Sequence, residues 1–322
     1  MRAVYADRPS STDPLSALRI GEQPEPAPSD ADRVTVTVRA AALNHHDLWT
    51  LKGSGRSADR YPVILGGEAS GVAEDGAEVV AGAMIVEPRW SHDPVRDPAR
   101  TLLGEDLPGT FAEHVSVPRH SLAPKPAWLS HEEAACLSGT WLTAYRMLFT
   151  KSGLRPGETV LIQGAGGGVS TALIRLARAA GFRVWVTGRD PGRLAKAEAI
   201  GAHATFPVGP PLPEPVDAVM ESVGRATWSH SLRSVRPGGT IVVTGATTGA
   251  DANAHLSRVF WSELRIVGST SGTLEEFQRL CQFMLHHDLR PDIAEVLPFP
   301  EARRGFERLL ASSVFGKTVF TW

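Results

Sequence analysis

Hydrophobic and polar residues alternate strictly in the segment VTVTVRA, residues 34–40. Val34, Val36 and Val38 would therefore share one face of an extended chain, which is the pattern of a half-buried β-strand. The segments GEASGVAE and GTFAEHVSVP have the same short β character, and Pro and Gly are plentiful over the first 130 residues. The first part of the chain therefore predicts a small antiparallel β unit.

From about residue 130 the pattern changes to apolar strands that alternate with helices. A helix is expected in HEEAACLSGTWLTAYRMLF, followed by strands at 159–163, 182–187, 216–222, 240–245 and 264–270, with helices at 169–181, 192–200 and in TWSHSLRSV. These strands are apolar throughout, as strands covered on both faces must be. The alternation predicts a parallel sheet with helices on both faces.

Three further segments complete the expected fold. Thr273 and Glu276 predict a capping box at the start of the helix TLEEFQRLCQFMLHHD. Residues 206–215 are Pro-rich and predict a loop. The segment RPGG (236–239) is expected to interrupt regular secondary structure between the preceding helix and the next strand. The final segment FGKTVFTW is typical of a strand that could return to the β unit.

Length, charge and cysteine content narrow the class of protein. The 322 residues suggest about two domains, and 42% hydrophobic with 21% charged residues is ordinary for a soluble protein. The net charge of −2 and the lack of a Lys/Arg run argue against nucleic acid or an anionic membrane as partner. With no signal peptide or membrane span in evidence, and only Cys136 and Cys281, we expect a cytoplasmic protein without a disulfide framework or a four-cysteine zinc site.

A glycine-rich turn lies between a strand and a helix in TVLIQGAGGGVSTALIRLA. Glycines let the backbone turn tightly and approach a pyrophosphate, and the helix start offers free N–H groups to it. Because the strand–turn–helix context is met, we predict a dinucleotide site rather than a turn without a ligand. The residues assigned to it are Gly164, Ala165, Gly166, Gly167, Gly168 and Val169.

The end of the next strand, VTGRDPGRLAK, bears on the choice of cofactor. An NAD site usually has an acidic residue here, whereas a 2′-phosphate is bound by cations and small polar groups. The residue at the usually acidic position is Gly188, and Arg189 and Arg193 follow it. Asp190 lies slightly beyond that position. We therefore predict NADPH, the alternative being that these charges are only solvated residues at a helix start.

The whole chain resembles the medium-chain dehydrogenase/reductase superfamily. The resemblance implies an α/β fold, a GroES-like β domain (residues 1–122 and 291–322) split around a Rossmann-type doubly wound parallel sheet domain (123–290). It covers essentially all 322 residues. The segments that carry it are ALNHHDLWTLKG, YPVILGGEASGV, LLGEDLPGTFAEHVSVP, CLSGTWLTAYRML, GAGGGVS, RPGGTIVVTG and FGKTVFTW.

The resemblance also shows which metal ligands are missing. The zinc-dependent alcohol dehydrogenases hold catalytic zinc with a Cys, a His and a second Cys, and the matching positions here are Asn44, Gly67 and Gly139. Glu68 remains, but a lone carboxylate cannot hold zinc, and the structural-zinc lobe is reduced to a segment without cysteine. The chain is therefore similar to the zinc-independent branch, which includes quinone oxidoreductases and enoyl reductases, and we expect no metal.

Two adjacent histidines, His45 and His46, stand in the segment ALNHHDL. Adjacent side chains diverge on a helix or a strand, so one ion cannot easily be reached by both. Asn44 as N-cap and Asp47 at the third helical position predict a short helix that ends at Gly53. Asp47 is therefore expected to be structural.

The resemblance assigns roles to individual residues. His45 takes the position that contacts the cofactor pyrophosphate, and His46 the position that relays a proton in the zinc enzymes. His46 could donate a proton to the substrate or could merely line the pocket. We assign Asn44, His46 and Thr143 to the catalytic group, with Thr143 beside the nicotinamide, and His45, Gly245 and Lys317 to the cofactor site.

One departure from the family affects the reaction. Many enoyl reductases of this superfamily place a tyrosine proton donor where this chain has Gly55, and Tyr61 comes too late to replace it. This favours quinone reduction, in which water can supply the proton. Three functions stay open: reduction of an activated C=C bond or quinone, reduction of a carbonyl with His46 as the acid, and a cofactor-binding scaffold with a non-redox role.

Partner and substrate follow only in outline. The family commonly pairs its last parallel strand with a second copy, so residues 264–270 predict a homodimer. The substrate is expected to be a small, apolar molecule, since aromatic residues fall in the segments that would line its pocket, although these could equally be core. They are Trp49, Trp90, Trp141, Phe260 and Trp261.

Overall fold

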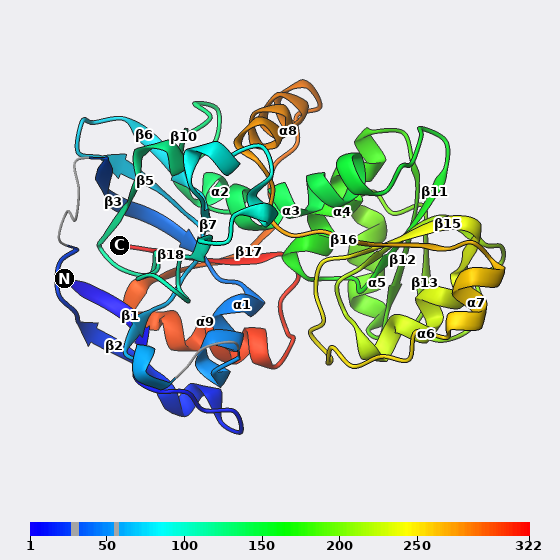
Figure 1. The fold of residues 1–322 in the computed structure, drawn as a ribbon, viewed down its shortest axis with the longest axis horizontal. Helices are drawn as coiled ribbons and strands as arrows, with labels where there is room; N and C mark the ends of the chain where they lie inside the picture. The colour runs from blue at the N-terminus through cyan, green and yellow to red at the C-terminus, as the bar shows by residue number, and fades with distance from the viewer. Residues whose placement is uncertain (27–31, 55–57) are drawn as a thin grey trace. The chain divides into compact units, whose positions relative to one another are not determined.

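The computed structural model describes residues 1–26, 32–54 and 58–322, which form two compact units (Figure 1). The first unit comprises Met1–Thr140, Ser271–Cys281 and Ile293–Trp322, and the second comprises Trp141–Thr270 and Gln282–Asp292. The chain therefore leaves the first unit and returns to it twice. Within the described residues, none of the helices combines the length and the apolar character that a membrane crossing needs.

The first unit is built on a seven-stranded sheet with the order β10-β6-β5-β3-β18-β17, in which β9 also pairs with β3. Its strands are β3 (Arg33–Ala42), β5 (Ala69–Ala73), β6 (Glu78–Ala81), β9 (His114–Pro118), β10 (Leu122–Pro124), β17 (Ile293–Pro298) and β18 (Lys317–Thr321). Val34, Val36 and Val38 are all buried, as the alternation predicts. The final strand β18 pairs antiparallel with β3, which confirms that the end of the chain rejoins the β unit.

Smaller sheets and short helices surround this sheet. Strands β2 (Leu18–Glu22), β1 (Arg2–Ala6) and β4 (Val63–Ile64) form one sheet, and β7 (Met84–Ile85) pairs with β8 (Thr101–Leu102). The helices of the unit are α1 (His45–Lys52), α2 (His131–Ala134) and α9 (Ala302–Leu310), with single turns of 3₁₀ helix at Pro14–Ala17, Ala58–Arg60, Pro88–Trp90, Pro94–Arg96, Arg119–Ser121 and Phe299–Glu301. Within the described residues of this unit, the named strands pair antiparallel, except that β17 and β18 pair in parallel.

The core of the first unit contains three fully buried phenylalanines. Phe111 meets Phe320 edge-on with ring centroids 5.0 Å apart, and it meets Phe306 at 6.2 Å. Phe320 lies on the last strand and Phe306 on α9, so aromatic packing fixes the returning C-terminal segment to the N-terminal sheet.

The second unit is a six-stranded parallel sheet with the order β13-β12-β11-β14-β15-β16. The strands are β11 (Thr159–Gln163), β12 (Arg183–Gly188), β13 (Ala204–Pro207), β14 (Val216–Glu221), β15 (Val235–Val243) and β16 (Arg265–Gly268). The order reverses between β11 and β14, which is the point at which open parallel sheets bind ligands. The strand–helix alternation predicts a parallel sheet, and the family resemblance implies that it is of the Rossmann type; both are confirmed.

Helices connect the parallel strands. They are α4 (Gly168–Ala179), α5 (Pro191–Ala199), α6 (Arg225–Ser234) and α7 (Leu256–Trp261), and they follow α3 (Leu142–Tyr145), which lies between π-helical turns at Leu137–Trp141 and Arg146–Lys151. Helix α4 packs on β11 and β12, whereas α6 packs on β14 and β15. Both helices therefore cover strands that meet at the reversal of strand order.

Helix α8 (Leu274–His286) begins with the expected capping box. The Thr273 N–H donates to Glu276 Oε2 at 2.8 Å, and the Glu276 N–H donates to Thr273 Oγ1 at 3.1 Å. The pair satisfies two backbone donors at the helix start, so this prediction is confirmed.

Two expected boundaries are wrong. Residues 236–239, predicted as a breaker, lie inside β15, because a register shift beside β14 brings the Gly239 backbone against the carbonyl oxygen of Asp217. A Cβ at Gly239 would lie 2.8 Å from that oxygen, so glycine lets the strand start early. Strand β13 likewise includes Phe206 and Pro207, which were expected in the Pro-rich loop.

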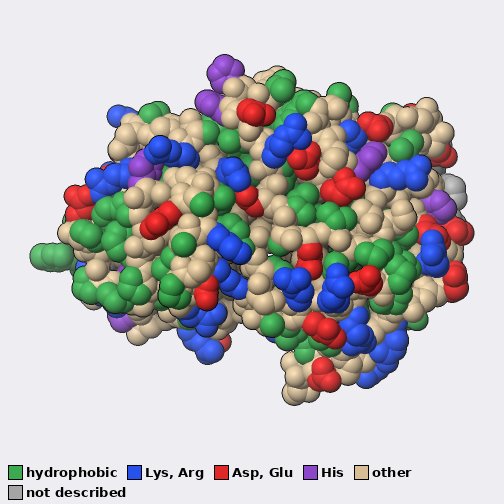
Figure 2. Space-filling model, turned by 180° about the vertical axis from the view of Figure 1, so that it is seen from behind, with side chains coloured by type: hydrophobic (Ala, Val, Ile, Leu, Met, Phe, Trp, Pro, Cys, Tyr) green, Lys and Arg blue, Asp and Glu red, His purple; other side chains and the backbone are tan. Residues whose placement is uncertain are grey.

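The face of the molecule drawn in Figure 2 carries acidic and basic side chains interspersed with apolar and uncharged ones. Mixed charge of this kind agrees with the net charge of −2. Among the residues that the structure describes, this face therefore lacks the strongly basic surface that would attract a polyanion such as nucleic acid.

Candidate active site

Helix α1 is anchored by the buried Asp47. The Asn44 N–H donates to Asp47 Oδ2 at 2.8 Å, and the Gly66 N–H donates to Asp47 Oδ1 at 2.8 Å. The helix ends at Gly53, whose φ of 82° is the left-handed conformation that favours glycine. The predicted helix from NHHD to Gly53 is thus confirmed, and Asp47 fixes its start to the chain at Gly66.

A buried ion pair joins Lys317 to Glu68, with Lys317 Nζ 2.8 Å from Glu68 Oε1. The two side chains are 4% and 0% exposed. The ammonium also donates within 2.9 Å to the Leu43 carbonyl, Asn44 Oδ1 and Thr140 Oγ1. Since an ammonium has three N–H donors and four oxygens surround it, its donor capacity is fully used.

The Glu68 carboxylate is equally well satisfied. Its Oε1 accepts from Asn44 Nδ2 at 2.9 Å and from Thr140 Oγ1 at 2.8 Å. Its Oε2 accepts from the backbone N–H groups of Gly139 (2.7 Å) and Thr140 (3.1 Å). We call Asn44, Glu68, Thr140 and Lys317 the lysine cluster.

The charge of the lysine cluster is balanced internally. Burial by itself would raise the pKa of Glu68, but the charge of Lys317 and the hydrogen bonds from Lys317, Asn44 and Thr140 hold it below its usual value. Glu68 is therefore ionised at neutral pH and pairs with the ammonium.

The residues present do not fit a catalytic zinc ion. Of the three matching positions, Gly67 and Gly139 offer no side chain, and Asn44 is already bonded within the lysine cluster. A Cβ at Gly139 would lie 2.8 Å from Glu68 Oε2, so even a small side chain there would displace the carboxylate. In the described part of the chain, no group of three or more His, Cys, Asp or Glu side chains is placed to hold a metal ion.

His46 forms a close pair with Glu105, with 2.5 Å between His46 Nε2 and Glu105 Oε2. Both side chains are partly exposed, and the edge of Trp49 faces the imidazole. Burial by itself would lower the pKa of His46, but the hydrogen bond that Glu105 accepts and the charges of Asp47, Glu105 and Asp106 raise it overall. His46 is thus held toward the imidazolium form.

His45 experiences the opposite field. Burial, together with the positive charges of Lys317 and Lys52, lowers the pKa of His45. The pKa values of the adjacent histidines of ALNHHDL are therefore shifted in opposite directions, that of His45 down and that of His46 up. The sequence alone could not predict these opposite pKa shifts, because Glu105 lies 59 residues from His46 and no motif identifies it as the partner.

The glycine-rich turn of the second unit has the geometry of an anion cradle. Gly164 has φ of 89°, and its N–H donates to the Thr187 carbonyl at 3.1 Å, so the chain turns sharply after β11. Gly167 precedes the first residue of α4, and a Cβ there would meet no atom within 4 Å. The backbone at the start of α4 therefore faces open space, as a pyrophosphate site requires. The remaining assigned residues, Ala165, Gly166, Gly168 and Val169, belong to the same turn and the first residues of α4.

The end of β12 has no room for a side chain. A Cβ at Gly188 would lie 2.8 Å from Leu194 Cδ2 and 2.9 Å from Ala165 Cβ. The next carboxylate, Asp190, is engaged as the N-cap of α5, where it accepts the Arg193 N–H at 2.8 Å. The position that usually carries an acidic residue is therefore empty of side chain, and Arg189 is exposed beside it.

Two other residues assigned from the sequence also lie in the second unit. Thr143 is partly buried in α3. Gly245 follows β15, and a Cβ there would lie 3.0 Å from the Ser222 carbonyl, so it packs tightly against the chain that follows β14. The lysine cluster and the His46–Glu105 pair lie in the first unit, and the glycine-rich turn, Gly188 and Gly245 lie in the second.

The aromatic residues proposed as pocket lining differ in exposure, and Trp49 and Trp90 are partly buried. Trp141 is 1% exposed and is part of the core. Phe260 and Trp261 on α7 are 68% and 84% exposed.

Tyr61 is not free to act as an acid, because its hydroxyl donates to the Thr50 carbonyl at 2.6 Å. Gly55 lies outside the described residues.

Neither cysteine has the surroundings of a reactive thiol. Cys136 is fully buried, as expected for a small hydrophobic residue, and burial raises its pKa strongly. Burial raises the pKa of Cys281 to about 12. Both thiols are therefore protonated and unreactive at neutral pH.

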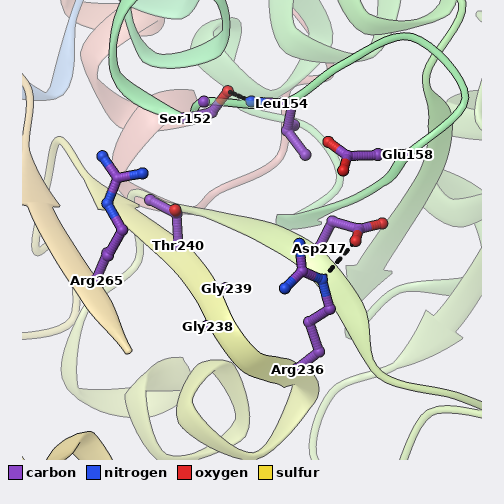
Figure 3. Close-up of a pocket in the computed structure, with 10 residues that line it drawn as sticks. Ser152, Leu154, Glu158, Asp217, Arg236, Gly238, Gly239, Thr240 and Arg265 are labelled. Atoms are coloured by element: carbon purple, nitrogen blue, oxygen red, sulfur yellow. Dashed lines mark hydrogen bonds and ion pairs between the residues drawn. The ribbon is translucent and has the colours of Figure 1, made fainter. Parts of the chain in front are cut away.

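The second unit has a polar pocket (Figure 3). The glycine-rich turn follows the carboxyl end of β11, whereas the pocket lies at the amino-terminal ends of the strands. It is lined from the amino-terminal ends of β11, β14, β15 and β16, and Arg236 Nε pairs with Asp217 Oδ1 across it at 2.6 Å. Open parallel sheets bind their ligands at the carboxyl ends of the strands. This pocket is therefore not the candidate cofactor site.

Comparison with known proteins gives consistent matches over the chain. Residues 30–127 match the family model described as alcohol dehydrogenase GroES-like domain, and residues 168–286 match zinc-binding dehydrogenase. Acryloyl-coenzyme A reductase of Sulfurisphaera tokodaii is 28% identical, over 95% of this chain and 97% of that protein. Quinone oxidoreductase of Lama guanicoe is 26% identical, over 89% and 88%. The crystal structure of an NAD-dependent alcohol dehydrogenase has a TM-score of 0.91 at 33% identity and covers 100% of both chains.

Replacing Lys317 by Met should destabilise the protein by about 3–5 kcal/mol, because it leaves the Glu68 carboxylate buried without its counter-charge. Adding Glu68→Gln to Lys317→Met should restore much of this loss. Urea unfolding of the two single variants and the double variant measures the coupling. Lys52→Met, at an exposed lysine of α1, is the control and should change stability by less than about 0.5 kcal/mol.

The contribution of the Lys317–Glu68 pair to stability should also depend on pH. The folded pKa of Glu68 is lowered, so its contribution to stability is present above the unfolded pKa and is lost as pH falls through the folded value. Acidification should therefore destabilise the wild type more than the double variant. Equal acid sensitivity of the two proteins would contradict the assigned charge state.

Proposed function

Because the chain belongs to the medium-chain dehydrogenase/reductase superfamily, we propose that it is an NADPH-dependent oxidoreductase that works without zinc. Its substrate is a small, apolar molecule with an activated carbon–carbon double bond or a quinone ring. The observation that carries the proposal is the lysine cluster, which places a saturated ammonium among the positions that would ligate zinc. Similarity to acryloyl-coenzyme A reductase and to quinone oxidoreductase supports the substrate class.

The lysine cluster favours conjugated acceptors over simple carbonyls. Hydride addition to a carbonyl builds negative charge on one oxygen, which a metal ion or a free donor must stabilise. Lys317 cannot do so, because all its N–H groups are directed to protein oxygens. A conjugated alkene or quinone spreads the same charge through its own π system and needs mainly a proton.

The glycine-rich turn and the end of β12 are proposed to hold NADPH. The N–H groups at the start of α4 would bind the pyrophosphate, and Arg189 and Arg193 would bind the 2′-phosphate. No acidic side chain fits at Gly188, so this position offers no carboxylate to the ribose hydroxyls. By the family resemblance, His45, Thr143, Gly245 and Lys317 are assigned to the cofactor side of the active site.

The reaction requires a hydride and a proton. NADPH, when bound, supplies the hydride. The β carbon of the substrate accepts it, the C=C π bond breaks, and negative charge moves to the α carbon and its activating carbonyl. His46 then donates a proton to the substrate, while Asn44 and Asp47 hold the helix that carries His46.

We further propose that the GroES-like part comprises residues 1–122 and 291–322 and the Rossmann part residues 123–290. We also propose that the protein is cytoplasmic and binds neither nucleic acid nor membranes.

We propose that the protein is a homodimer. Strand β16 is the edge of the parallel sheet, and Ile266 on it is 42% exposed. An apolar edge strand usually requires a cover, and a second copy of the strand supplies one.

Reduction of an α,β-unsaturated ketone with deuterium at the transferred position of NADPH tests the reaction. We expect the saturated ketone with deuterium at the β carbon, because hydride goes to the conjugated alkene. The acceptor 9,10-phenanthrenequinone should also be reduced. Mass spectrometry and NMR of the product identify the bond reduced, and an allylic alcohol would instead establish carbonyl reduction. NADPH binding with no turnover of any acceptor would support the scaffold alternative.

Changing Arg189 and Arg193 together to Ala should weaken NADPH binding by about 10–100-fold, since two charge-assisted contacts to the 2′-phosphate are lost. NADH binding should change little. Fluorescence titration of both nucleotides gives the ratio of the two dissociation constants. Equal losses for both nucleotides would contradict recognition of the 2′-phosphate, and Arg155→Ala, an exposed arginine before β11, serves as the control.

Light scattering at micromolar concentration should give twice the chain mass of 34.5 kDa. Ile266→Glu should shift the mass toward the monomer, because a charge would be buried at the paired edge. Val95→Glu, at a similarly exposed apolar residue (43%) of the first unit, should leave the mass unchanged. A monomeric wild type would refute the dimer.

A further inference from the structure

The His46–Glu105 pair is built from two segments that are fixed at one point of the backbone. His46 lies on α1, whose start is tied to Gly66 by Asp47. Glu105 lies in the turn after β8, where Gly104 has φ of 77° and a Cβ on it would lie 2.7 Å from the Gly66 carbonyl oxygen. Both members of the pair therefore take their positions from Gly66.

The turn that carries Glu105 is itself held rigidly. The Asp106 and Leu107 N–H groups both donate to the Leu102 carbonyl, at 2.9 and 3.1 Å. The Leu102 N–H donates in return to Asp106 Oδ2 at 3.0 Å, and the Gly104 N–H donates to the Leu107 carbonyl. A side chain on a turn with so many internal bonds keeps a defined direction.

The pair leaves one imidazole nitrogen available. His46 Nε2 is engaged by Glu105, and within the described residues no hydrogen bond is formed by Nδ1. The His46 side chain is 30% exposed, so part of the ring is open to a small molecule. A histidine held at one nitrogen and open at the other is the arrangement of a positioned acid or base.

The charges that face His46 are predominantly negative. Asp47 lies on the same helix, and Glu105 and Asp106 lie on the turn. Asp106 is itself paired with the exposed Arg60 at 3.1 Å. A second histidine–carboxylate pair, His114 with Glu25, has a similar separation of 2.8 Å but a much more exposed carboxylate, 60% against 20% for Glu105.

We propose that Glu105 is the positioning residue that holds His46 as an imidazolium with Nδ1–H directed to the substrate, and that the pair is the proton donor of the reductase. This rests on the proposed function. In the step, the Nδ1–H bond breaks and a new C–H or O–H bond forms on the reduced substrate. Glu105 stays ionised and holds the neutral imidazole that results, and solvent returns the proton to Nδ1.

The pair also favours substrates that need a proton as well as a hydride. An enone or a quinone requires both, and the donor lies on the helix next to the lysine cluster, which supplies none. His46, positioned by Glu105, thereby takes the place of the missing tyrosine donor.

NMR titration of the His46 imidazole in the intact protein tests the pairing without turnover. We expect the wild-type pKa to lie above the ordinary value near 6.5, and Glu105→Gln to lower it by about one unit or more, because a carboxylate at hydrogen-bond distance is removed. Glu25→Gln, at the exposed pair, is the control and should leave His46 unchanged. Identical His46 titration in the wild type and in Glu105→Gln would overturn the proposal.

Steady-state kinetics tests the donor role. In Glu105→Gln the alkaline limb of the kcat profile should move to lower pH, and kcat at pH 7.5 should fall about 10–100-fold with the KM for NADPH unchanged. His46→Gln should abolish the alkaline limb, and circular dichroism verifies that both variants fold. A fall in kcat at all pH values without a shift of the limb would indicate a merely structural residue and would refute the role.

The two experiments separate the proposals. A shifted His46 titration together with no turnover of any acceptor would refute the reductase function and the donor role, while the pairing would stand. Turnover with an unshifted titration would refute the role of Glu105 and leave the reductase function intact.

Discussion

The buried ion pair between Lys317 and Glu68 is the constraint on which the first unit depends. It joins residues 249 positions apart and holds Asn44 and Thr140 in the same group of hydrogen bonds. Neither charge can be removed alone without leaving the other unpaired in the interior. The start of α1, the chain after β4 and the final strand β18 are therefore fixed together at the place where the catalytic chemistry is expected.

The same constraint decides which chemistry is available. Because the ammonium is saturated and its charge is balanced by Glu68, it offers no electrophile to a substrate oxygen. In the proposed reaction, the proton for the substrate must therefore come from another group. His45 and His46, which follow Asn44 in the chain, differ in how readily they would carry it. Burial and the charge of Lys317 lower the pKa of His45, whereas Glu105 and the neighbouring aspartates raise that of His46 against the effect of burial. A histidine with a lowered pKa and one with a raised pKa thus follow one another on the first turn of α1.

The sequence predicts the features that depend on neighbouring residues. The helix from Asn44 to Gly53, the capping box of α8 and the glycine-rich turn before α4 all rest on contacts within a few positions, and the structure has all three. The family resemblance predicted the two-part fold. Features built from distant segments could not be found in this way, since neither the Glu68–Lys317 pair nor the Glu105–His46 pair has a local signal. The early start of β15 was missed because a register shift, not local propensity, sets it.

Metal dependence tests the central claim most directly. The protein would be treated with a strong chelator, its zinc content measured by mass spectrometry, and NADPH oxidation by an enone and a quinone followed before and after. We expect less than one zinc ion per chain and an unchanged rate, because the donor set at Asn44, Gly67 and Gly139 does not fit zinc. Loss of activity on chelation, with recovery on adding Zn²⁺, would contradict the account.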